Sequence, residues 1–277
     1  MPNLKSQIAV VVVVLGLAVI AGFLWGKRPA STIEPNTAST TISLAIDQSA
    51  DSTTSTSTTP YKVEYYPIPQ NKEELASSTA PSLTRQIRFS SDTSPEVKGI
   101  LVQNIATLRD SLSKNYVNFS GWMNLAIQYK TAGDYEGAKE VWEYISKLYS
   151  NSSIPLHNLG DLYQHHLTDF AKAESYYKRS IAMDSTQAID YLALFDLYRY
   201  SYKQDTTLAV DILKTGIEHV KGNQVIDLYS TLGSYYKDKN DVANAILYYT
   251  KERDAAEKEG NSALVAELDT VLSELQK

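Results

Sequence analysis

Four segments of the chain share one pattern of side chains, and this repeat restricts the possible folds more than any other feature. Each segment has a bulky residue, a leucine three positions later and a tyrosine four positions after the leucine: WMNLAIQY, LHNLGDLY, YLALFDLY and YSTLGSYY. The four leucines are Leu125, Leu159, Leu194 and Leu232, so the pattern recurs after 34, 35 and 38 residues. Residues four apart lie on one face of a helix, and we therefore expect each segment to be helical.

Each segment is followed by a turn and by a second apolar stretch with helical spacing. Four alanines lie near the starts of these stretches: Ala138, Ala173, Ala209 and Ala245. Four bulky residues follow about one turn later: Trp142, Tyr177, Leu213 and Tyr249. The chain is therefore predicted to contain about four pairs of helices, each with an apolar face too broad to stay in water alone. Stacking one pair on the next buries these faces and produces a solenoid.

A helix-turn-helix unit of about 34 residues with these small and large residues resembles the tetratricopeptide repeat. The resemblance covers about residues 119–258 and implies an all-α, right-handed superhelical solenoid. The expected small residue after the leucine is Gly160 or Gly233 in two copies, but Ala126 and Phe195 in the others. We therefore expect irregular packing in the third repeat, whose turn also carries extra residues around 201–207.

These patterns divide the chain into five parts. Residues 1–28 are predicted to be a membrane anchor and residues 29–93 a disordered stalk. A capping helix is expected at 94–114, because Ser94 and Pro95 are typical of a helix start. The repeats follow at 115–258, in units of about 119–152, 153–186, 187–223 and 224–258. A second capping helix is expected at 259–277.

The N-terminal anchor is predicted from residues 8–25, IAVVVVVLGLAVIAGFLW, which carry no charge. As a helix they would span roughly 27 Å, close to the thickness of the hydrocarbon core. A cleaved signal peptide is the alternative, with small residues at Val19 and Ala21. Trp25, Lys27 and Arg28 favour a retained transmembrane helix, because they are typical of a membrane exit.

The stalk is predicted from its composition. Residues 31–60 contain 16 Ser or Thr, with too few apolar side chains to bury a core. No Lys or Arg occurs between Pro29 and Pro60, which favours export. We expect a single-pass membrane protein whose C-terminal domain lies on the extracytoplasmic side.

In tetratricopeptide repeats the first helices line a groove that binds peptides. The resemblance therefore implies that the groove presents these residues: Met123, Ile127, His157, Asp161, Leu192, Asp196, Arg199, Ser230 and Ser234. Members of this family that bind a peptide's C-terminal carboxylate use paired Lys and Asn residues on the first groove helix. Here that helix presents Met123 and Ile127 with only Asn124 nearby, which argues against binding of a C-terminal carboxylate.

His157, Asp161 and His165 lie four residues apart, so a helix would stack them on one face. Such a stripe can ligate zinc, with Asp196 as a distant fourth candidate. His165 and His166 are explained more simply as a solvated edge near a turn. We predict neither a metal site nor a cofactor.

Composition excludes several classes of function. The chain has no cysteine, which rules out disulfides, thiolate metal sites and a cysteine nucleophile. Its net charge of −6 argues against binding to nucleic acid. No phosphate-binding, dinucleotide or hydrolase motif is present. The sequence thus favours a non-enzymatic adaptor that holds a partner protein or peptide at a membrane. The alternative is an architectural subunit of a cell-envelope or secretion assembly, with the solenoid buried by oligomerisation.

Overall fold

The structure is a computed structural model that describes residues 72–204 and 206–277. The predicted anchor at residues 8–25 and the predicted stalk as far as residue 71 lie outside this part of the chain. None of the described helices is long and apolar enough to cross a membrane.

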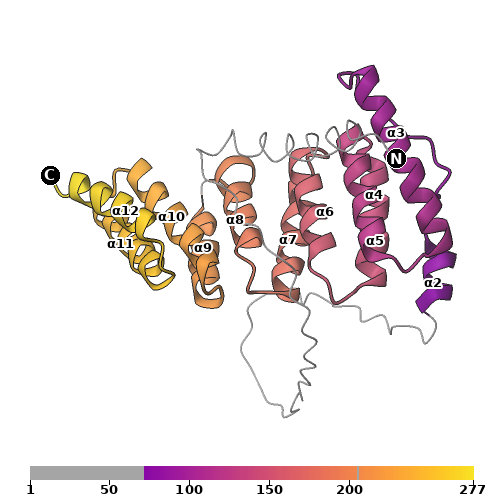
Figure 1. The fold of residues 1–277 in the computed structure, drawn as a ribbon. Helices are drawn as coiled ribbons and strands as arrows, with labels where there is room; N and C mark the ends of the chain where they lie inside the picture. Colours follow the sequence, from indigo (N-terminus) through magenta and orange to yellow (C-terminus); the bar gives the residue numbers. More distant parts are fainter. Residues whose placement is uncertain (1–71, 205) are drawn as a thin grey trace, which may run out of the picture. The chain divides into compact units, whose positions relative to one another are not determined.

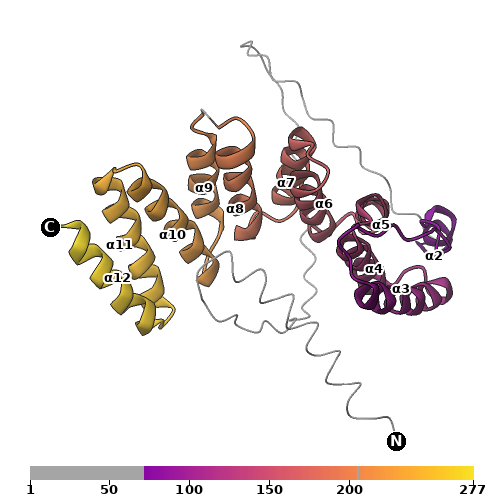
Figure 2. The same ribbon diagram turned by 90° about the horizontal axis from the view of Figure 1, so that it is seen from above.

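The regular secondary structure in the described part of the chain is all helical, with no strand. Its elements are α2 (Lys72–Thr79), α3 (Pro95–Lys114), α4 (Phe119–Ala132), α5 (Tyr135–Leu148), α6 (Ile154–His165), α7 (Phe170–Met183), α8 (Ala188–Asp196), the π-helical turn η1 (Leu197–Ser201), α9 (Leu208–His219), α10 (Asn223–Asp238), α11 (Val242–Lys258) and α12 (Ser262–Leu275). From α3 onward each α-helix packs against the next along the chain (Figures 1 and 2). The prediction of an all-α fold built from four helix pairs is therefore confirmed for this region.

A turn with a common design joins the two helices of the first, second and fourth pairs. In each, one residue adopts a left-handed conformation: Gly133 (φ 86°), Thr168 (φ 53°) or Asn240 (φ 57°). An aspartate comes next, and its carboxylate accepts a hydrogen bond from a backbone N–H in the first turn of the second helix. These caps satisfy amide groups that a helix start leaves without partners.

A tyrosine packs on a glycine inside two of the pairs. A Cβ atom added at Gly160 would lie 2.6 Å from ring carbons of Tyr177, and one at Gly233 would lie 2.7 Å from ring carbons of Tyr249. The first helix therefore has no room for a side chain where the second helix places its ring. In the third pair the sizes are exchanged, because Phe195 and Leu213 occupy the equivalent sequence positions and both are buried.

The third pair departs from the others, as the sequence predicts. Helix α8 ends at Asp196 and continues as the π-helical turn η1, in which the N–H of Tyr202 donates to the carbonyl of Leu197 over 2.7 Å. π-Helical turns widen a helix locally and accommodate extra residues. Tyr198 consequently stays buried although the connection to α9 is long.

The prediction of disorder is wrong for residues 72–93. Ala76 in α2 is fully buried, and its carbonyl accepts a hydrogen bond from the Tyr144 hydroxyl in α5 (3.0 Å). Further along, the Arg85 guanidinium lies 3.2 Å from the buried Asp134 carboxylate and 3.0 Å from Glu140. These contacts join positions far apart in the sequence, so local composition does not reveal them.

Both ends of the helical array are capped. At the N-terminal end α3 packs on α4, with Ser94 as its N-cap, as predicted; α2 adds a contact to α5 that the sequence did not indicate. At the C-terminal end α12 packs on α11 through a separate apolar cluster that includes Leu264, Leu268 and Leu272.

The close packing at Gly160 gives a testable expectation. Gly160→Ala should lower the free energy of unfolding by about 1–3 kcal/mol, because the added methyl group overpacks the Tyr177 ring. Gly99→Ala in α3 is the matched control. A Cβ there meets no described atom within 4 Å, so helix propensity should stabilise that variant by up to about 1 kcal/mol. Urea denaturation of both variants measures the difference, and equal effects would contradict this account.

Candidate protein-binding face

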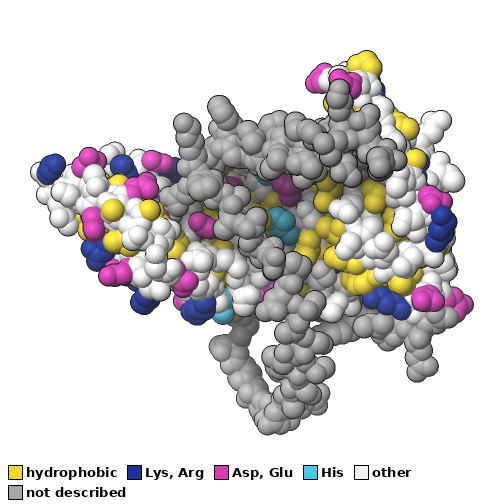
Figure 3. Space-filling model, viewed as in Figure 1, with side chains coloured by type: hydrophobic (Ala, Val, Ile, Leu, Met, Phe, Trp, Pro, Cys, Tyr) yellow, Lys and Arg dark blue, Asp and Glu magenta, His cyan; other side chains and the backbone are white. Residues whose placement is uncertain are grey.

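We call the side of the array formed by α4, α6, α8 and α10 the first-helix face. The nine predicted groove residues lie on these helices, except that Arg199 lies just beyond α8 in η1. Hydrophobic side chains gather over the region of α4 to α6, and histidine and acidic side chains lie beside them toward α8 (Figure 3). The face therefore changes from apolar to polar along the array.

The end formed by α4 is apolar. Ile127 is 43% exposed, whereas Met123 is half-buried and packs against the main core. Beside them, the Asn104 amide of α3 donates to the Gln128 side chain over 3.4 Å. Ile127 thus remains available to a partner, while Met123 contributes to the core as well.

An ion pair joins the first two repeats across this face. The Lys130 ammonium donates to a carboxylate oxygen of Asp161, and both side chains are about one-third exposed. His165 lies on the other side of the same carboxylate, with its Nε2 3.7 Å from Asp161 Oδ1. Asp161 is therefore already paired within the protein.

His157 serves the fold rather than an open groove. Its Nδ1 lies 2.8 Å from a carboxylate oxygen of Asp190, which is buried. The other oxygen of Asp190 accepts a hydrogen bond from the Ser180 hydroxyl over 2.8 Å. This network ties α6 and α7 to the start of α8. The partner of His157 is thus Asp190, which is not part of the predicted stripe with Asp161 and His165.

No group of three or more His, Asp or Glu side chains in the described residues is placed to hold a metal ion. His166 stacks on the Tyr135 ring with centroids 4.3 Å apart, so it is more enclosed than the solvated edge predicted for it. Burial lowers the pKa of His166, and the nearby Lys130 charge lowers it further.

The Arg199 side chain has partners within the protein, whereas the Asp196 carboxylate has none among the described residues. The Arg199 guanidinium lies 4.6 Å from the centre of the Tyr235 ring and 3.6 Å from the Asp238 carboxylate, so it joins the third repeat to the fourth. Asp196 is half-buried, and its carboxylate has no hydrogen bond or ion pair with another described residue. Burial raises the pKa of Asp196, while the nearby His165 acts in the opposite direction.

The remaining predicted residues lie farther along the face. Leu192 is half-buried and packs against the core, and Ser230 is half-buried on α10. The Ser234 hydroxyl lies 3.3 Å from the Tyr249 hydroxyl, within its own helix pair.

Two exposed isoleucines were missing from the predicted groove. Ile154 is 52% exposed and Ile189 is 55% exposed. Each lies five residues before the repeat leucine, at the start of its first helix. The same position is Ser120 in the first repeat and Asp227 in the fourth, so no pattern shared by the repeats marks these residues.

A buried carboxylate stabilises the junction between the second and third repeats. Glu174 in α7 accepts hydrogen bonds from the Tyr198 hydroxyl (2.6 Å), from Lys203 (2.8 Å) and from Lys178 (2.8 Å). Burial by itself would raise the pKa of Glu174, but these hydrogen bonds outweigh burial and lower the pKa to about 2. The charged form of Glu174 therefore holds η1 and the following connection against α7.

This junction should give the protein a measurable dependence on pH. The pKa of Glu174 lies below its unfolded value, so its contribution to stability is fully present above about pH 4.5 and is lost as the pH falls toward 2. Glu174→Gln should lower the free energy of unfolding at pH 7 by about 1–3 kcal/mol. The difference from the unmodified protein should shrink with acidification. The control Glu257→Gln, at an exposed position, should show no such change with pH. If Glu174→Gln were destabilised equally at every pH, the charged form of Glu174 would not be what stabilises this junction.

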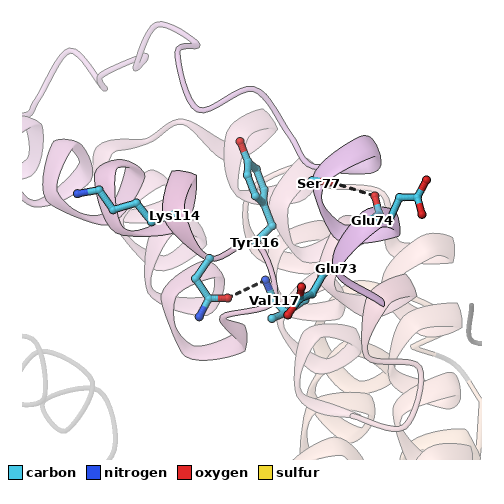
Figure 4. Close-up of a pocket in the computed structure, with 7 residues that line it drawn as sticks. Glu73, Glu74, Ser77, Lys114, Tyr116 and Val117 are labelled. Atoms are coloured by element: carbon cyan, nitrogen blue, oxygen red, sulfur yellow. Dashed lines mark hydrogen bonds between the residues drawn. The ribbon is translucent and has the colours of Figure 1, made fainter. Parts of the chain in front are cut away.

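Two pockets in the described part of the chain are lined by none of the nine predicted groove residues. A pocket of about 640 Å³ opens between α2 and the link from α3 to α4, lined by Glu73, Glu74, Ser77, Lys114, Asn115, Tyr116 and Val117 (Figure 4). A pocket of about 440 Å³ lies between α9, α10 and α11. Neither brings together a nucleophile, a base and an acid in an arrangement typical of catalysis.

Two of the helix pairs resemble a known repeat family. The family model for the tetratricopeptide repeat matches residues 155–187 and 226–251, which lie in the second and fourth pairs. These two segments are similar to tetratricopeptide repeats. Among solved structures, the crystal structure of MamA is similar, with 20% sequence identity, coverage of 60% of this chain and 94% of that chain, and a TM-score of 0.45. No curated protein sequence matches the chain.

The first and third helix pairs lie outside the segments that match the family model. They share the leucine and tyrosine spacing of the matching pairs, and the first pair also shares their turn. The third pair differs most, with Phe195 in place of the small residue and η1 in place of a regular helix end. The third pair is thus the least regular of the four.

Proposed function

We propose that this protein is a membrane-tethered scaffold that binds a partner protein through its first-helix face. The observation that carries the proposal is an exposed isoleucine on each of three successive first helices: Ile127, Ile154 and Ile189. Water contact with apolar side chains is unfavourable, and their burial by a partner would supply binding energy. Tetratricopeptide repeats generally bind proteins rather than catalyse reactions, which supports a non-enzymatic role.

Tethering is the second part of the proposal. It is supported by the uncharged run at residues 8–25 and by Trp25, Lys27 and Arg28 after it. The absence of Lys and Arg between Pro29 and Pro60 supports a repeat domain on the extracytoplasmic side. The scaffold would then hold its partner near a membrane surface.

The partner-binding face can be tested with two double variants. Ile154→Ser with Ile189→Ser should unfold almost like the unmodified protein, because exposed changes usually alter stability by no more than about 0.5 kcal/mol each. The same change should reduce the partner recovered with the full-length chain from native membranes at least tenfold, as measured by quantitative mass spectrometry. Val242→Ser with Leu247→Ser is the control, since both residues are exposed on second helix α11.

Unchanged recovery with the isoleucine variant would place the partner on another surface. Light scattering distinguishes the architectural alternative. If the unmodified chain forms a stable homo-oligomer that the isoleucine variant breaks into monomers, the face is a self-contact and the adaptor function is refuted.

The anchor can be tested separately. Val13→Arg with Leu17→Arg should release the protein from membranes or block its insertion, because each charge near the bilayer centre costs about 2.5–3.5 kcal/mol. Alkaline carbonate extraction measures retention. Ile33→Arg with Ile42→Arg adds the same charge outside the apolar run and should leave retention unchanged. A mature chain that begins near Gly22 and is recovered in soluble form would show a cleaved signal peptide instead.

A further inference from the structure

The boundary between the first two repeats has an ion pair, and the next boundary has only its acidic member. In the first repeat, Lys130 lies five residues after the repeat leucine; in the second, Asp161 lies two residues after it. These two side chains form an ion pair across the repeat boundary. The same two positions at the next boundary are Gln164 and Asp196.

Gln164 does not replace the missing cation. Its side chain is buried, and its Oε1 accepts a hydrogen bond from the Tyr177 hydroxyl over 3.0 Å. Arg199 does not replace it either, since its guanidinium lies against Tyr235 and Asp238. His165 lies near enough to act electrostatically on Asp196, but its Nε2 contacts Asp161 at 3.7 Å. Asp196 therefore keeps a half-buried carboxylate without a hydrogen bond or ion pair to any described residue.

Two apolar side chains share the helix face of this carboxylate. Ile189, Leu192 and Asp196 are spaced i, i+3 and i+7 on α8 and its end, so they form one stripe. Ile189 is 55% exposed and Leu192 is half-buried. The stripe thus offers an apolar surface next to a negative charge that is partly removed from water.

We propose that Asp196 binds a lysine or arginine side chain of the partner protein, in the place that Lys130 fills for Asp161, while Leu192 and Ile189 contact an apolar side chain of the same segment. This inference rests on the proposed function and specifies the chemistry of the partner. Charge complementarity carries it, because a half-buried carboxylate gains most from a cation that brings its own hydrogen-bond donors. The flanking apolar residues favour a protein segment over a free polyamine.

The helix geometry sets the spacing of the recognised residues. Leu192 and Ile189 lie about 6 and 10 Å from Asp196 along the helix axis, at 1.5 Å per residue. An extended segment advances about 3.3 Å per residue. The basic and apolar side chains of the partner should therefore be two or three positions apart.

Selection from a displayed library of random twelve-residue peptides tests the inference. The full-length chain in mild detergent should enrich peptides with a lysine or arginine two or three positions from an aliphatic residue. Asp196→Asn should lose this enrichment, whereas Glu267→Gln, which removes an exposed acid on α12, should retain it.

An affinity measurement then identifies the contact. Fluorescence anisotropy with one enriched peptide should show at least tenfold weaker binding to Asp196→Asn, or about 1.4 kcal/mol. Replacing the basic residue of the peptide by glutamine should cause the same loss, and the two changes together should cause little more.

Three outcomes are possible and each is informative. Coupled losses in the peptide and the protein support the inference. Enriched peptides that lack basic residues and bind Asp196→Asn at full strength overturn it and leave the scaffold function intact. If no peptide is enriched over the detergent background, both the inference and the peptide-binding function of this face are refuted.

Discussion

The structure depends on how closely the two helices of a pair can approach. At Gly160 and Gly233 the first helix has no side chain, and ring carbons of Tyr177 and Tyr249 occupy the space that a Cβ would need. The aromatic ring is thereby buried against backbone, which yields a large apolar contact without lengthening the distance between helices. With this distance set inside a pair, the remaining apolar faces are left to pack between pairs, and the array grows by stacking.

Electrostatic contacts then fix neighbouring pairs relative to one another. Lys130 reaches from the first repeat to Asp161 in the second, and Glu174 binds η1 and Lys203 of the third. Arg199 continues the series toward α10. Half-buried ion pairs add little net stability on their own but penalise any arrangement that leaves a charge unpaired. These ion pairs therefore favour one relative position of neighbouring helix pairs, which apolar packing alone would not specify.

The sequence predicted the parts of the fold that repeat or have local signals. Leucine and tyrosine spacing located the first helices, and Ser94 with Pro95 located the start of α3. It did not predict that residues 72–93 are ordered. Ala76 contacts Tyr144 in α5 and Arg85 contacts Asp134, and both partners are distant in the sequence. At the candidate site the sequence indicated which residues lie on the first helices. It could not show that His157 and Arg199 are already engaged by Asp190 and Asp238, since those contacts exist only once the repeats are stacked.

The apolar interior is divided between two clusters, and this division affects how the protein comes apart. One cluster surrounds Trp122 and Trp142 and extends to Leu232, while the other joins Ile226, Ala245 and Tyr249 to Leu264 and Leu268. Tyr236 is the partly buried residue that touches both. In arrays of this kind neighbouring units open with separate free energies. Leu232 of α10 and Tyr248 of α11 belong to the first cluster, whereas the buried residues of α12 all belong to the second. Helix α12 can therefore exchange its amide protons while the rest stays closed, and the free energy of opening differs along the chain.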